Sequence, residues 1–288
     1  MDISKVQINV VRSDGKEFLI DNQSWKITSD GLDGFDFITP TISTEANAFG
    51  DGSVVQSIHI GEKDRTVKCR YQGTLQEKAA QRQFVRNFLN PKYTFKVVVD
   101  YMEEKKYCEG SLYTMSCPTE NIYKDLTLQF TILSTQPYLL SYDDFNKNIA
   151  SVEGGLEFNF EIPKEGVEFG TYSFAKEIYI DNQGDVETYC KAIFTAKGTV
   201  INPMLKKDDV YIKIIDTMNA GDVIEMDLVS KPVHITKNGQ NIIGKTDRSS
   251  SFNEMLFSVG QNVISFDADN GDNLLDVVIL YNERFLGM

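Results

Sequence analysis

Residues 74–101 read TLQEKAAQRQFVRNFLNPKYTFKVVVDY and predict a helix that is followed directly by an apolar strand. Thr74 and Glu77 have the spacing of a capping box, in which each side chain accepts a hydrogen bond from a backbone N–H at the helix start. Apolar residues then recur at the helical period, and Pro91 disfavours a helical residue before it. We therefore predict a helix over residues 75–89 that buries one face against a sheet.

Strand signals follow this helix. Residues 94–101 are rich in Phe and Val and predict a buried strand, and a return strand is expected at 107–113. Four charged residues between them predict the tip of a hairpin: Glu103, Glu104, Lys105 and Lys106. Residues 126–133 alternate between apolar and polar, which is the period of a strand with one buried face. The helix and these strands should form the core of one domain.

The sequence as a whole predicts a mainly β protein of two domains. Residues 1–140 are expected to form a β-sandwich or split-barrel-like domain with one α-helix, in which residues 43–53 are a mobile surface loop. Residues 141–152 are polar, lack periodicity and predict a linker. Residues 153–288 show short strands with frequent turn signals, which is typical of a jelly-roll β-sandwich.

Composition excludes several classes of protein. The chain has 288 residues and a formal net charge of -13, which argues against a nucleic-acid partner because phosphate binding relies on Lys and Arg. No apolar run approaches the roughly 20 residues of a membrane helix, and the N-terminus lacks the apolar core of a signal peptide. We expect folding in a cytoplasm, with four reduced and buried thiols: Cys69, Cys108, Cys117 and Cys190.

Catalytic signals are weak throughout the chain. Its two histidines, His59 and His234, fall in different predicted domains, and no nucleophile, phosphate-loop or zinc motif accompanies them. We predict that the protein is not an enzyme and binds no cofactor. In the second half Tyr172, Tyr189 and Tyr211 could serve as platforms for sugar rings, although strand tyrosines more often pack in a core.

The best metal candidate is the group Asp267, Asp269 and Asp272, whose carboxylates could offer oxygen ligands to calcium. Gly271 occupies a position where a calcium loop has Asp or Asn, and no Glu follows at the ligand spacing. We expect a polar hairpin turn here, with a weak cation site as the alternative. No metal site is predicted.

Lys78, Arg82 and Arg86 recur every four residues and form a cationic stripe on the predicted helix. Such a stripe is ordinarily a solvated face, and a docking surface for an acidic neighbouring subunit is the alternative. Together with the charged tip, these residues are the candidate oligomer and docking residues: Lys78, Arg82, Arg86, Glu103, Glu104, Lys105 and Lys106.

The order and spacing of several short elements resemble one known family. In the first half these are the Gly50-Asp51-Gly52 loop, the strand from Arg65, the helix ending near Pro91 and the strand running into Gln136-Pro137-Tyr138. In the second half they include residues 180–185, 221–227, 233–239 and the closing strand through Arg284-Phe285. Over nearly its whole length the chain is similar to the distal tail proteins of siphophages. It departs from many of them in having Ser134-Thr135-Gln136 before the Pro-Tyr pair.

This resemblance implies an N-terminal β domain with one helix and a C-terminal galectin-like jelly roll. It implies a homohexameric ring at the virion tail tip, through which DNA passes without specific binding. The ring would join the tail tube protein to the tail-associated fibre or lysin protein and to the receptor-binding protein. The resemblance carries over no catalytic residue. The alternative function is a carbohydrate-binding accessory protein that contacts the host cell wall through the C-terminal β-sandwich.

Overall fold

The computed structural model describes residues 6–102, 104–118, 124–142, 145–148, 177–230 and 232–288, with the backbone alone for 145–148. The chain forms two compact units. The first comprises Met1–Tyr142 together with Arg284–Met288, and the second comprises Asp143–Glu283. None of the described helices is long and apolar enough to span a bilayer.

The first unit is built on one antiparallel sheet of nine strands, and its main path follows the order β2-β1-β7-β8-β9-β6-β3. Strand β10 pairs with both β8 and β22. The bounds are β1 (Gln7–Arg12), β2 (Glu17–Ile20), β3 (Trp25–Asp33), β6 (Lys63–Tyr71), β7 (Thr94–Tyr101), β8 (Glu104–Ser116), β9 (Leu126–Ser134), β10 (Leu139–Ser141) and β22 (Arg284–Phe285). In the described residues this sheet stays open, with β2 and β3 at its edges.

Helix α1 (Leu75–Phe88) packs on one face of this sheet. The capping box is formed, because Thr74 Oγ1 accepts from the Glu77 amide and Glu77 Oε2 accepts from the Thr74 amide. Val85 and Phe88 are buried, and the Phe88 ring contacts the ring of Phe18 on β2. The predicted helix over residues 75–89 is confirmed, with Leu89 as its C-cap.

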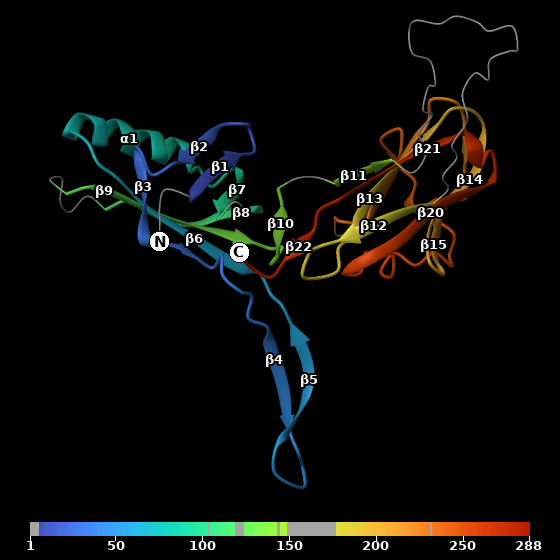
Figure 1. Ribbon diagram of the computed structural model, residues 1–288, viewed down its shortest axis with the longest axis horizontal. Helices are drawn as coiled ribbons and strands as arrows, with labels where there is room; N and C mark the ends of the chain where they lie inside the picture. Colours follow the sequence, from blue (N-terminus) through green and yellow to red (C-terminus); the bar gives the residue numbers. More distant parts are fainter. Residues whose placement is uncertain (1–5, 103, 119–123, 143–144, 149–176, 231) are drawn as a thin grey trace, which may run out of the picture. The chain divides into compact units, whose positions relative to one another are not determined.

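Strands β4 (Thr41–Ala46) and β5 (Ser53–His59) form a separate two-stranded sheet in the first unit (Figure 1). The prediction of a loop over residues 43–53 was therefore wrong for residues 43–46 and 53, which lie in strands, whereas residues 47–52 connect the two strands. The Ser and Thr residues of this range occur in exposed strands as well as in loops. Composition alone therefore did not distinguish a strand from a loop here.

The β7–β8 hairpin turns two residues earlier than predicted. Met102 has a positive φ of 52° at the turn, and β8 already begins at Glu104. Residues 104–106 therefore lie in a strand and not at a hairpin tip, because Lys105 and Lys106 pair in register with Asp100 and Val99 of β7. Glu103 falls outside the described residues.

The second unit is a β-sandwich. One sheet has the order β11-β21-β13-β17-β18-β19, and the other has the order β12-β20-β14-β15 with β16 paired to β14. The bounds are β11 (Phe145–Asn148), β12 (Glu177–Asn182), β13 (Cys190–Ala196), β14 (Val200–Lys207), β15 (Val210–Lys213), β16 (Thr217–Met218), β17 (Val223–Asp227), β18 (His234–Lys237), β19 (Gln240–Asn241), β20 (Gly260–Asn270) and β21 (Leu275–Tyr281). Two 3₁₀ turns, η2 (Ile243–Lys245) and η3 (Asp272–Leu274), connect strands.

One core lies between the two sheets of this unit. Phe194 and Val277 contribute from one sheet, and Leu205, Ile264 and Phe266 contribute from the other. The mainly β fold with one helix in the described residues is thus confirmed. The more particular likeness to galectins stays a prediction.

The unit boundaries differ from the expected domains in two places. The expected linker, residues 141–152, contains β11, which pairs with β21 of the second unit. Residues 284–288 belong to the first unit, where Leu139 pairs with Phe285 and the Met288 amide donates to Phe35 O at 3.0 Å. The physical reason is that Phe285 and Met288 pack against the apolar core of the first unit. Separate folding of the two domains stays a prediction.

Candidate assembly surfaces

The cationic stripe of α1 is largely used within the first unit. Lys78 Nζ donates to Lys124 O at 2.9 Å, and an Arg82 guanidinium nitrogen donates to Pro118 O at 3.3 Å. Both side chains are half-buried and contact the connection between β8 and β9. Arg86 is exposed in the last helical turn, where its positive charge interacts favourably with the negative end of the helix dipole. Of the three, Arg86 is therefore the most accessible to a partner.

The charged residues at the start of β8 are also engaged. Lys105 pairs with Asp100 at 3.6 Å, and Lys106 pairs with Glu104 at 2.9 Å. Lys106 is only 9% exposed, donates to Gly287 O at 3.2 Å and lies 4.2 Å from the Phe285 ring centroid. This lysine holds residues 284–288 against the sheet and is not available as an exposed docking residue.

A shallow groove opens on the face of the nine-stranded sheet opposite α1. It has a volume of about 440 Å³, and its apolar lining includes Val11 of β1, Leu19 of β2 and Val98 of β7. Lys96 also lines it, 3.6 Å from the ring centroid of Tyr107. Lys105 and the acids Glu17 and Asp100 line the groove as well, so it presents charges of both signs beside apolar side chains. We call it the β1–β2–β7 groove; sequence patterns gave no signal for it.

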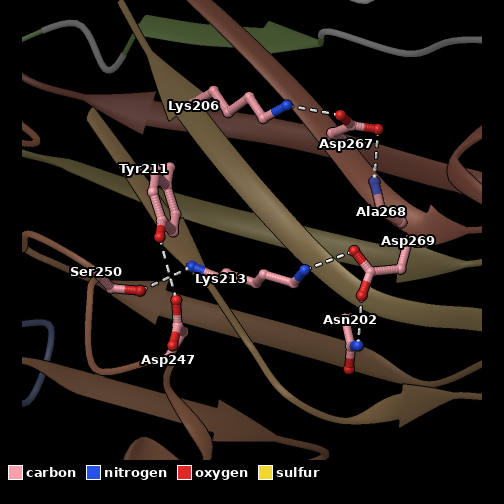
Figure 2. A network of polar contacts seen from close by, with 9 residues as sticks. All are labelled: Asn202, Lys206, Tyr211, Lys213, Asp247, Ser250, Asp267, Ala268 and Asp269. Carbon is pink, nitrogen blue, oxygen red and sulfur yellow. Dashed lines mark hydrogen bonds and ion pairs between the residues drawn. The ribbon is translucent and has the colours of Figure 1, made fainter. Parts of the chain in front are cut away.

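In the second unit, strands β14, β15 and β20 carry a network of paired charges (Figure 2). Lys206 Nζ lies 2.6 Å from Asp267, and Lys213 Nζ lies 2.5 Å from Asp269. Asn202 also donates to Asp269 at 2.7 Å. The hydrogen bond from Asn202 and the bond from Lys213 hold the pKa of the Asp269 carboxyl below its ordinary value.

This pairing occupies two of the three carboxylates of the candidate calcium site. Asp267 and Asp269 lie within β20, while Asp272 begins η3 beyond the turn at Gly271. Lysines neutralise the first two carboxylates, and Asp272 lies in a separate element. The three aspartates are therefore not arranged as ligands of one cation. Within the described ranges no three His, Cys, Asp or Glu residues are grouped as a metal site would need.

The remaining candidates are scattered. His59 ends β5 in the first unit, and His234 starts β18 in the second. The Tyr211 hydroxyl donates to Asp247 at 3.2 Å (Figure 2). Tyr189 packs against the sandwich core. Tyr172 lies outside the described residues.

The four cysteines are free thiols in the structure. Three are buried, Cys69, Cys108 and Cys190, and burial raises the pKa of Cys69 and Cys190 to about 12. Those thiols therefore stay protonated and unreactive near neutral pH. Cys117, between β8 and β9, is half-buried.

Comparison with known proteins finds a family match for one part of the chain. Residues 183–285 match the family model described as the siphovirus-type tail component, C-terminal domain. This part of the chain is therefore similar to the siphovirus tail components, and the resemblance to distal tail proteins of siphophages is confirmed. A tail component of this kind is a structural part of the phage tail and baseplate, located at the virion tail tip and made in the host cytoplasm.

Solved structures extend the likeness in fold to both units. The crystal structure of the SPP1 Dit protein (gp 19.1), described as a paradigm of the hub adsorption apparatus in phages that infect Gram-positive bacteria, matches with a TM-score of 0.67. Identity is 9%, and the match covers 96% of this chain and 99% of that one.

Two structures of the phage P2 baseplate in its activated conformation, with Ca and with Sr, match with TM-scores of 0.57 and 0.56. Their identities are 12% and 11%, and each match covers 98% of this chain and 99% of that one. No curated protein sequence matches the chain. The family and these structural neighbours are structural tail proteins and not enzymes.

Proposed function

We propose that the protein forms a homohexameric hub ring at the tail tip. The ring joins the tail tube protein to the tail-associated fibre or lysin protein and to the receptor-binding apparatus. The observation that carries this proposal is the likeness in fold to a hub protein over 96% of the chain, both units included. The match of residues 183–285 to a tail-component family supports the same role.

The surfaces of the first unit suit ring assembly. In a closed ring of identical subunits each copy presents two different, mutually complementary patches, because the contact is head-to-tail. The first unit offers a projecting exposed hairpin, β4–β5, and the β1–β2–β7 groove. Arg86 adds an exposed cation on α1 for contacts with acidic neighbours. The net charge of -13 suits a channel through which DNA must pass without being held.

The carbohydrate-binding alternative has less support from the second unit. Sugar recognition needs polar groups that are free to bond to hydroxyls, beside an exposed ring. The carboxylates and lysines in Figure 2 are already paired with one another, and the Tyr211 hydroxyl is bonded to Asp247. We therefore assign this unit the docking of baseplate partners.

The proposal is tested by light scattering of the purified full-length protein across a concentration series, alone and with the tail tube protein of the same phage. Six copies of a 32.6 kDa chain give a particle of about 196 kDa. We expect this mass at the high end of the series, or on adding the tube protein. A particle of monomer mass under every condition contradicts the ring.

A further inference from the structure

Residues 284–288, which we call the latch, pair with the strand that leads into the second unit. Leu140 of β10 pairs with Arg284 of the latch, and β10 also pairs with β8 of the main sheet. Strand β10 ends just before the second unit begins, and β22 begins directly after that unit ends. The latch therefore holds the two chain connections of the second unit side by side within the first unit.

The latch also contacts the segment that precedes the β4–β5 hairpin. The Ile38 amide donates to Leu286 O at 2.9 Å, and the Met288 amide donates to Phe35 O at 3.0 Å. These two bonds run in opposite directions between the same two segments, so residues 35–38 and the latch are joined along their backbones. The base of the hairpin is thus attached to the latch.

Close packing holds the latch in place. Phe285 and Met288 pack against the apolar core of the first unit, and Lys106 Nζ donates to Gly287 O at 3.2 Å. A Cβ added at Gly287 would lie 3.0 Å from the backbone of residues 36–37. The backbones of the latch and of the hairpin base therefore approach so closely that a side chain at Gly287 would force them apart.

We infer that the latch joins the base of the hairpin and the two connections of the second unit into one cooperative unit, which opens and closes as a whole. Proteins open locally in contiguous cooperative units, at a lower free energy than global unfolding requires. Because the latch is bonded to β10 on one side and to residues 35–38 on the other, its release frees both together.

This cooperative unit gives the proposed hub a means of regulation. A partner that docks on the second unit and pulls on its two chain connections acts on the latch. The attachment of the hairpin in the first unit then weakens at the same time. Only this consequence rests on the proposed function, because the cooperative unit is a property of the single chain.

Hydrogen exchange of the full-length protein, measured at single amides across a series of low urea concentrations, tests the inference. The probes are the amides of Ile38 before the hairpin, Met288 in the latch and Tyr142 after β10, which donates to Lys105 O at 3.3 Å. We expect the three amides to show one opening free energy and one urea dependence. Amides of β7, in the middle of the sheet, should exchange more slowly and with a steeper urea dependence.

A first pair of variants perturbs the latch through its lysine. Lys106→Met removes the charged donor to Gly287 O and keeps the apolar stem, whereas Lys105→Met changes the exposed neighbouring lysine. In Lys106→Met alone we expect the exchange of all three probes to rise by the same factor, on the order of tenfold, because a hydrogen bond from a charged group is lost. The amides of β7 should be unchanged.

A second pair of variants does not depend on charge. Gly287→Ala adds a Cβ against residues 36–37, and Gly244→Ala adds one where no atom lies within 4 Å. Only Gly287→Ala should speed the exchange of the three probes, again equally. Unequal changes among the probes, or an equal change in β7, overturns the inference. If the probes open together but light scattering finds no ring, the cooperative unit stands and the proposed ring is wrong.

Discussion

Asp222 connects two turns of the β-sandwich through its carboxylate. It accepts from the Asn219 amide at 2.9 Å and from Asn238 Nδ2 at 2.8 Å, and Lys237 Nζ lies at 3.0 Å. The backbone hydrogen bond from Asn219, the side-chain bonds from Asn238 and Lys237 and the charge of Lys237 lower the pKa of Asp222 to about 2. The ionised carboxylate is therefore favoured in the folded state over the unfolded state.

This lowered pKa predicts a dependence of stability on acid pH. A carboxyl with a lower pKa in the folded state stabilises the protein fully above its unfolded pKa of about 3.9, and this contribution is lost as the pH falls towards 2. We expect the unfolding free energy of Asp222→Asn, measured by urea denaturation, to fall less steeply between pH 4 and pH 2 than that of the parent. Asp14 also has a pKa of about 2, because its carboxylate accepts a hydrogen bond from Arg12. Part of the pH dependence of the unfolding free energy should therefore remain in the variant. Identical slopes would contradict the role of Asp222.

Lys106 shows what local sequence does not reveal. The run from Glu103 to Lys106 has the composition of a solvated turn, and the sequence therefore predicted an exposed tip. Its actual partners, Gly287 and Phe285, lie more than 170 residues further along the chain. No spacing rule connects positions so far apart, so the burial of this lysine could not be predicted.

At the scale of elements, α1 was predictable because its signals are local. The capping box, the apolar period and the stop before Pro91 lie within one short stretch, and the structure contains all three. Strand β9 was predictable for a similar reason, because its side chains alternate in burial from Leu126 to Phe130. The β4–β5 hairpin is exposed on both faces, and without a buried face its sequence shows no such alternation.

The capping box gives a prediction for α1. Thr74→Ala removes the acceptor for the Glu77 amide and should lower the unfolding free energy by about 0.5–2 kcal/mol. Gln76→Ala is the matched control, because Gln76 is exposed in the same helical turn and makes no capping bond. Urea denaturation of both variants measures the difference. A Thr74→Ala variant as stable as the control would show that the cap contributes little to the fold.

At the scale of the whole molecule, the chain enters the second unit after Tyr142 and returns to the first unit at Arg284. The sequence predicted two β domains, and the resemblance to distal tail proteins predicted their class. The return of residues 284–288 was missed because five residues carry too little pattern to be assigned to either domain. Their place depends on Phe285 and Met288 finding a core that is formed by the other end of the chain.

We propose that this chain is the subunit of a tail-tip ring through which DNA leaves. Duplex DNA carries about one negative charge per 1.7 Å of its axis, so a basic channel would bind the phosphates and slow ejection. The most direct test is electron cryomicroscopy of the protein assembled with its tail tube protein. We expect a six-fold ring whose channel is lined by acidic or neutral side chains. The absence of a ring in that mixture, or a ring whose channel is lined mainly by Lys and Arg, would contradict it.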